Sequence, residues 1–111
     1  MTSALITNTV QALIAHHADD AGRAAVYQTA LDIFNQYTPA VRKHGNRWFL
    51  EMVDADGVTF NDTYGHIFSR TVALYGNFYK TKREASTHTL TNKELRDFLD
   101  CCVIVAWELV W

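Results

Sequence analysis

The stretch Asn46–Asp62, NRWFLEMVDADGVTFND, decides the fold class. Its first part, Arg47–Val53, is rich in aromatic and branched residues, which favour a β-strand. The letters DADG that follow are typical of a hairpin loop in which Gly57 takes the left-handed conformation. We therefore expect a second short strand at 58–60. Because side chains alternate along a strand, two faces are expected. One carries Trp48, Leu50 and Met52, and the other carries Phe49, Glu51 and Val53.

Helices are expected on both sides of this hairpin. A first helix over 3–17 begins at Ser3, and a second runs from Asp19 or Asp20 to about Thr38, where Pro39 ends it. Apolar spacing predicts a third helix over 62–83, in which two glycines indicate either close helix packing or a break. The chain is therefore expected to be a single small α+β domain over residues 1–111. Its predicted element order is α-α-β-β-α-α, with a two-stranded antiparallel hairpin packed by helices.

The last helix has the strongest local signal. Thr91 and Glu94 form a capping-box pair, so a helix is predicted from residue 92 to the end. At 100° per residue, Ile104, Trp107 and Trp111 fall on the otherwise charged side and form a second apolar stripe. We interpret this stripe as a partner-binding surface and expect a homodimer through the C-terminal segment. Two alternatives stay open: the hairpin covers the stripe, or residues 101–107 join the hairpin as a strand.

Six of the ten basic residues form two clusters, at 42–47 and 80–83. These residues are Arg42, Lys43, Arg47, Lys80, Lys82 and Arg83. Because aromatic residues adjoin both clusters, contact with single-stranded nucleic acid or another anion is one interpretation. Each cluster also follows the C-terminus of a predicted helix, where cations are favoured. A small nucleic-acid-binding regulator is thus the alternative function.

The candidate sites for chemistry are weak. His16, His17, Asp19 and Asp20 lack metal-ligand spacing, and the DADG loop lacks the later oxygen ligands of a calcium loop. No base is predicted beside Cys101 or Cys102, so neither is expected to be a nucleophile. We therefore predict no enzyme activity, no catalytic residue, no metal and no cofactor.

Composition sets the functional hypothesis. The chain has 111 residues, of which 49% are hydrophobic and 13% aromatic, and its net charge is −2. The longest apolar run is too short to span a bilayer, and neither a signal peptide nor a membrane partner is expected. Two adjacent reduced cysteines favour the cytoplasm. We expect a non-catalytic antagonist or immunity-type protein, of the kind carried by phages and mobile elements, that inhibits another protein.

Overall fold

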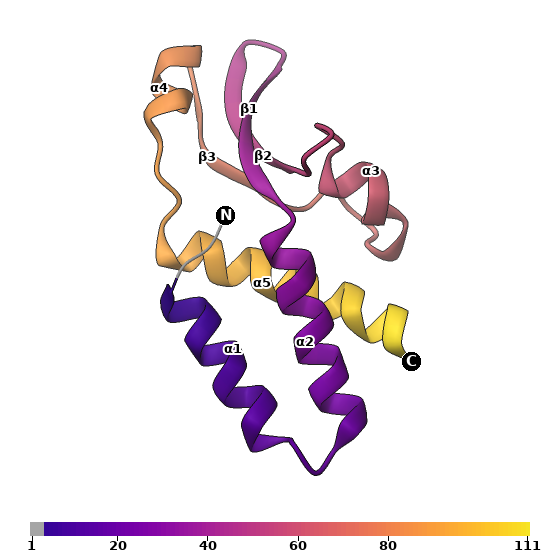
Figure 1. Cartoon of the computed structure of the whole chain (residues 1–111). Coiled ribbons are helices and arrows are strands. Elements are labelled where there is room, and N and C mark those ends of the chain that lie inside the picture. The colour runs from indigo at the N-terminus through magenta and orange to yellow at the C-terminus, as the bar shows by residue number, and fades with distance from the viewer. Residues whose placement is uncertain (1–3) are drawn as a thin grey trace.

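The computed structural model describes residues 4–111, with side chains from Ile6 onward. It contains five α-helices, one short 3-10 helix and three strands within those residues (Figure 1). Their bounds are α1 Ala4–His16, α2 Ala21–Asn35, β1 Thr38–His44, β2 Arg47–Val53, α3 Phe60–Tyr64, η1 Gly65–Ile67, β3 Leu74–Tyr79, α4 Lys82–Thr87 and α5 Asn92–Val110. Helices α1, α2 and α5 form one half of the molecule, and the sheet with α3 and α4 forms the other.

The α+β class is confirmed, but the sheet differs from the predicted hairpin. It is antiparallel, has the strand order β1-β2-β3, and therefore places β2 in the centre. The partner of β2 is β1, which begins where the second helix was expected to end. Pro39 lies inside β1 and faces Met52 in the register. A proline lacks an N–H group, and an edge strand such as β1 tolerates that loss.

The DADG segment forms the predicted turn, although little strand follows it. Gly57 has φ +77°, the left-handed conformation that was expected. The Asp54 carboxylate accepts the backbone N–H groups of Asp56 and Val58 at 2.9 and 3.0 Å. After the turn, only one isolated bridge pairs Val53 with Thr59. The expected strand at 58–60 is thus reduced to a single bridge, and α3 begins at Phe60.

The predicted helix over 62–83 is wrong. α3 ends at Tyr64, and the second half of the segment is β3, which pairs with β2. Three residues near β3 have positive φ values, namely Ala73 at 60°, Gly76 at 91° and Phe78 at 52°, and a right-handed helix cannot contain them. Between Trp48 and Leu50 the register shifts, and a bulge at Gly76–Phe78 accommodates the extra residues. The apolar residues that predicted one helix are therefore divided among α3, the segment after η1 and β3.

The helical half follows the sequence closely. Asp20 caps α2 by accepting the N–H of Arg23, and both bonds of the capping box at Thr91 and Glu94 are present. The expected cap at Ser3 lies outside the described residues. Residues 101–107 are helical within α5, so the alternative of a third strand there is excluded. No helix within the described chain is long and apolar enough to cross a membrane.

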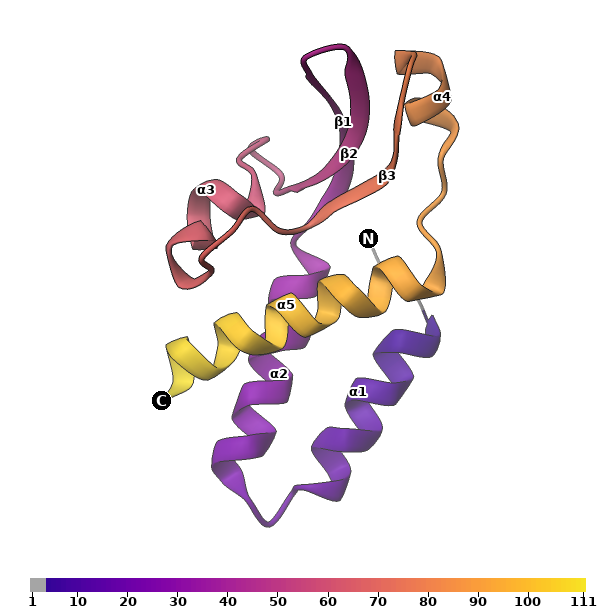
Figure 2. The same cartoon turned by 180° about the vertical axis from the view of Figure 1, so that it is seen from behind.

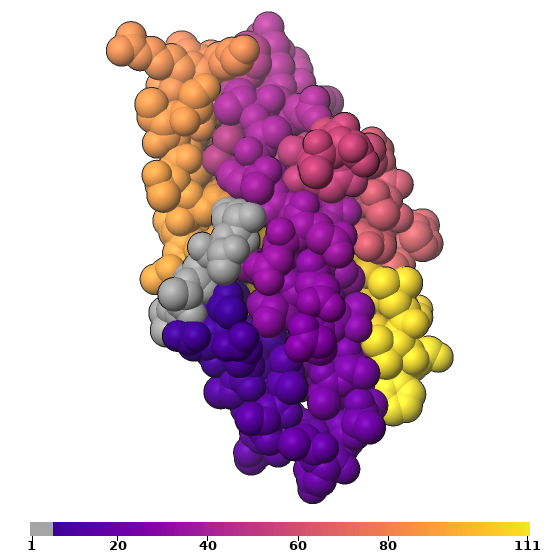
Figure 3. Space-filling model, viewed as in Figure 1, coloured from indigo at the N-terminus to yellow at the C-terminus, as the bar shows by residue number. Residues whose placement is uncertain are grey.

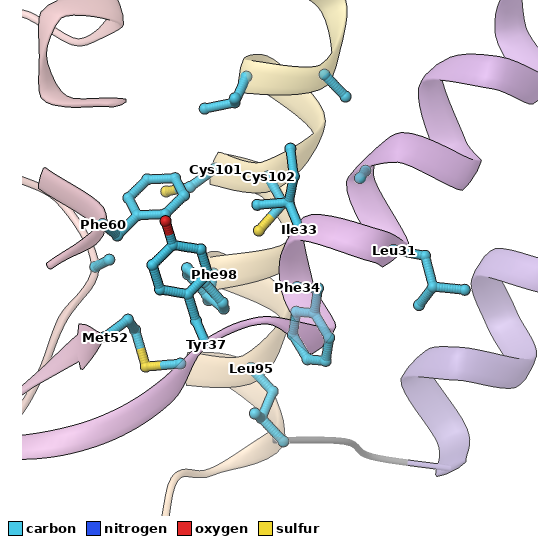
Figure 4. Packing of buried hydrophobic residues seen from close by; sticks show 14 of the residues in the cluster. Leu31, Ile33, Phe34, Tyr37, Met52, Phe60, Leu95, Phe98, Cys101 and Cys102 are labelled. Atoms are coloured by element: carbon cyan, nitrogen blue, oxygen red, sulfur yellow. The ribbon is translucent and has the colours of Figure 1, made fainter. Parts of the chain in front are cut away.

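A cluster of aromatic rings joins the two halves (Figure 4). Phe98 of α5 lies 5.6 Å from Phe34 and 5.3 Å from Phe60, measured between ring centroids. Tyr37, between α2 and β1, contacts both Phe60 and Phe98. Phe34, Phe60 and Phe98 are fully buried. This cluster fixes α5 against the rest of the protein through one face and leaves its opposite face uncovered.

Candidate functional site

The C-terminal turns of α5 carry an apolar surface that is partly open to solvent. Ile104, Trp107 and Trp111 are 47%, 42% and 71% exposed. We call these three residues the tryptophan surface. In Figure 2, α5 crosses in front of α2, and Figure 3 shows its end beside α2 and α3 at the edge of the molecule. The hairpin does not pack over the stripe, so that alternative is excluded.

The two tryptophans form an ordered pair. Their rings are stacked, with centroids 5.6 Å apart and an interplanar angle of 16°. They lie four residues apart on the helix, a spacing that brings side chains together. Trp111 also rests against the first turn of α2, where a Cβ at Gly22 would lie 2.6 Å from Trp111 Cζ2. Because neighbours hold both rings, little rotamer freedom remains to be lost on binding.

The N-terminal half of the same helix face is polar and hollowed. Lys93, Arg96, Asp97 and Asp100 line a shallow depression of about 360 Å³, together with Asn92. All five of these side chains are exposed. The exposed face of α5 therefore runs from a hollow lined by two cations and two carboxylates to the stacked aromatic pair, with Glu108 beside the pair.

The six basic residues singled out in the sequence are brought to one end of the protein. β1 and β2 carry one cluster, and the β3–α4 segment carries the other; α4 packs against both β1 and β2 (Figure 1). The clusters divide between the two faces of the hairpin, however. Arg42 lies on the face opposite Trp48 and donates to the carbonyl oxygen of Gly57 at 3.3 Å. Arg47 precedes Trp48 in β2 and so lies on that same opposite face.

Lys43 and Lys82 meet at Trp48. Their Nζ atoms lie 5.4 and 6.0 Å from the centroid of the Trp48 ring. Lys43 is the cross-strand partner of Trp48, whereas Lys82 belongs to the first turn of α4. Both lysines are exposed, and the tryptophan is half-buried. Two ammonium groups from segments far apart in the sequence therefore share one aromatic ring.

A chain of hydrogen bonds beside β3 was not expected from the sequence. The Tyr79 hydroxyl lies 2.8 Å from His88 Nδ1, and His88 Nε2 lies 2.8 Å from Glu94 Oε1. The other oxygen, Glu94 Oε2, accepts the N–H of Gly76 at 3.0 Å. His88 and Glu94 border a cavity of about 440 Å³ between β3 and the start of α5. The sequence marked Glu94 only as a capping residue, because its bond to Gly76 depends on the unpredicted strand β3.

The Glu94 carboxylate is held in its charged form. Partial burial alone would raise its pKa, but hydrogen bonds from the backbone of Thr91 and Gly76 and the proximity of His88 together lower it. In the same region the Tyr75 hydroxyl donates to Asp97 Oδ2 at 3.1 Å, and burial raises the pKa of Tyr75. Two carboxylates that border this cavity, Glu94 and Asp97, thus fasten α5 to β3.

The two cysteines are buried thiols. Burial, with the nearby carboxylates of Asp97 and Asp100, raises the pKa of Cys101 to about 11. Burial also raises the pKa of Cys102. Since the thiolate is the reactive form, both groups are weak nucleophiles at neutral pH.

The other candidate residues have local contacts. The His17 ring stacks on Tyr27 at 5.8 Å, and the Asp54 carboxylate is engaged in its own turn. Among the residues that the structure describes, no three His, Cys, Asp or Glu side chains are grouped so as to hold a metal ion.

No protein-family model, no curated protein and no solved structure matches this chain.

Proposed function

We propose that this protein is a non-catalytic binding protein and that the tryptophan surface is the site at which it binds another protein. The observation that carries the proposal is the stacked, exposed pair of Trp107 and Trp111. Tryptophan is enriched among the residues that dominate binding energy at protein interfaces. A contiguous exposed apolar group is also a liability for a monomer unless something covers it.

A non-catalytic role agrees with the state of the reactive groups. Both thiols are protonated at neutral pH because burial raises their pKa values. His88 and Glu94 hold each other and the backbone of Gly76 in place. The reactive thiols are therefore in their unreactive form, and His88 and Glu94 stabilise the fold.

In the free protein, the partner that fits this surface is a second copy of the chain. If two α5 helices pair antiparallel about a two-fold axis near Asp100, Trp107 meets Lys93 and Ile104 meets Arg96 of the other copy. Cations attract the faces of indole rings, and Glu108 would also approach those cations. Trp107 would enter the hollow of about 360 Å³ on the opposite helix. The same face thus supplies both halves of a self-complementary interface.

For the biological role, we propose an antagonist or immunity-type inhibitor of phage or mobile-element origin that acts in the cytoplasm. The support is the net charge of −2 and the concentration of apolar contact area at one helix end. In this scheme the target protein replaces the second copy on the tryptophan surface. Homodimer formation would then protect the surface until the target is present.

The test is the double change Trp107→Ala, Trp111→Ala, followed by light scattering and by pull-down from the host cell. Loss of a buried interface tryptophan costs about 2 kcal/mol or more, roughly thirtyfold in affinity. We expect a dimeric wild type, a monomeric variant with unchanged helical circular dichroism, and loss of any captured target.

The matched control is Leu109→Ala. Leu109 is 58% exposed on α5 but lies 140° around the helix from Ile104 at 100° per residue. It should change neither the oligomeric state nor target capture. A monomeric wild type whose double variant still captures every partner would overturn the proposal.

A further inference from the structure

Basic and acidic residues are distributed unevenly along this chain, and most of the basic ones lie at one end of the fold. The segments 38–50 and 78–87 contain six of the ten Lys and Arg residues but only one of the twelve Asp and Glu residues, Glu84. Those segments therefore carry a net charge of +5, and the rest of the chain carries −7. The fold places both segments at the same end, because α4 packs against β1 and β2 (Figure 1). Although the net charge of the chain is −2, one end of the protein is therefore strongly basic.

The lysines at this end are available to a ligand. The ion pairs found among the described residues are Arg23 with Asp20 and His88 with Glu94, so none of the six basic residues takes part in one. Glu84, the one acid in the two segments, accepts a hydrogen bond from the Thr81 hydroxyl at 3.0 Å. Lys43, Lys80, Lys82 and Arg83 are all exposed.

Trp48 holds two of these cations, Lys43 and Lys82, close together before any ligand binds. The negative face of an indole ring attracts ammonium groups, and here it gathers Lys43 and Lys82 at 5.4 and 6.0 Å. Each ammonium group retains N–H donors for a ligand. Like charges that are held together before binding reduce the ordering cost for an anion that bridges them.

We infer that this basic surface, centred on Lys43, Trp48 and Lys82 and extended by the exposed Lys80 and Arg83 of the β3–α4 segment, binds the phosphodiester backbone of a nucleic acid. The surface is distinct from the tryptophan surface and does not depend on the function proposed for it. Lysine ammonium groups bind phosphate as point charges, and a nucleic-acid backbone offers several phosphates in a row.

Two other anionic partners fit this surface less well. Carboxylates of an acidic peptide are best recognised by bidentate arginines, but three of the four cations are lysines. A membrane surface would be matched by exposed apolar side chains beside the cations. The exposed apolar residue nearest in sequence, Phe78, packs against Phe49 on the opposite sheet face. The chemistry therefore favours a phosphodiester backbone.

The experiment is fluorescence anisotropy with a labelled single strand of about 20 nucleotides and with its duplex, titrated over a range of salt concentrations. Wild type should bind at low salt, with an affinity that falls as salt rises. The double change Lys43→Gln, Lys82→Gln should weaken binding about tenfold. It should also reduce the slope of log affinity against log salt by about 1.4 with the single strand and by about 1.8 with the duplex. The preferred form is the one that wild type binds more tightly at the same salt concentration.

Two further variants make the result specific. Arg23→Gln, Arg70→Gln removes the same charge elsewhere, and should change affinity less than about twofold if local contacts matter. Trp48→Leu leaves every charge in place but releases both ammonium groups, so we expect about a threefold loss. Circular dichroism and thermal melting must show that each variant is folded. If Trp48→Leu unfolds, the test is made with the double change Lys43→Gln, Lys82→Gln and its arginine control.

The inference fails if the lysine variant binds as well as the arginine control. It also fails if wild type ignores both nucleic acids but binds polyglutamate, or vesicles containing phosphatidylserine, through Lys43 and Lys82. Either of those ligands would assign the surface to another class of partner.

Discussion

Trp111 and Gly22 are in direct contact, and the absence of a side chain at Gly22 provides the space for the indole ring. A Cβ atom at residue 22 would lie 2.6 Å from Trp111 Cζ2, much closer than van der Waals contact allows. The first turn of α2 thereby sets the position of the side chain that caps α5. Because Trp111 stacks on Trp107, the same contact aligns both rings.

The change Gly22→Ala should therefore displace Trp111 without removing it. Alanine is favoured over glycine in a helix by up to about 1 kcal/mol, so α2 itself should not be weakened. We expect the near-ultraviolet circular dichroism of the stacked indoles to decrease and dimer affinity to fall several-fold. Gly65→Ala is the control, because a Cβ there would meet no atom closer than 3.9 Å. An unchanged indole signal in Gly22→Ala would show that the contact does not hold the pair.

Asp100 gives a sharper test of the proposed antiparallel dimer. The two-fold axis near this residue would place the two Asp100 carboxylates close to each other, and like charges at an interface oppose association. Asp100→Asn should therefore tighten the dimer, by about threefold or more, in sedimentation equilibrium at low salt. The gain should shrink as salt rises, since screening weakens the repulsion. Weaker association of Asp100→Asn would argue against this pairing of helices.

Glu94 predicts how stability depends on pH. Its folded pKa is lowered, so its stabilising effect is fully present above the ordinary pKa of about 4.5 and is lost as pH falls through the folded pKa. Glu94→Gln should cost about 1–2 kcal/mol of unfolding free energy at neutral pH, because charged hydrogen bonds to Thr91 and Gly76 are weakened. Urea unfolding of both proteins should show the difference shrinking in acid. Asp56→Asn, at an exposed carboxylate in the DADG turn, should show no such loss.

Gly57 tests the DADG turn. Its φ of +77° is unfavourable for other residues, and nothing lies within 4 Å of a Cβ at this position. The cost of Gly57→Val is thus backbone strain alone, about 1–2 kcal/mol by thermal or urea unfolding. Gly65, with an ordinary negative φ, again serves as the comparison site. Equal stability of Gly57→Val and wild type would mean that the turn adopts another conformation.

The sequence predicted those parts of the fold that are determined locally. The capping box at Thr91 and Glu94, the cap at Asp20 and the turn at Gly57 each depend on residues only a few positions apart. The strand β3 forms instead because it pairs with the second edge of β2, which is distant in the sequence. It also requires positive φ values that the spacing of apolar residues does not predict. A helix was therefore predicted where a strand forms.

The same distinction applies to the candidate sites. The tryptophan surface could be located from helical periodicity, because one helix carries all of it. The contact of Lys43 and Lys82 with Trp48 could not be predicted from the sequence. It forms only because β3 pairs with β2 and brings α4 against the hairpin. Likewise, the chain from Tyr79 through His88 to Glu94 exists only once β3 lies beside α5.

The bond between Glu94 and Gly76 has a consequence for hydrogen exchange. The Gly76 N–H lies in the bulge of β3, yet its acceptor is a side chain in the first turn of α5. When that turn frays, the carboxylate moves away and the amide becomes exchangeable with solvent deuterium. A single amide in the sheet thus serves as a probe of helix opening 18 residues further along the chain.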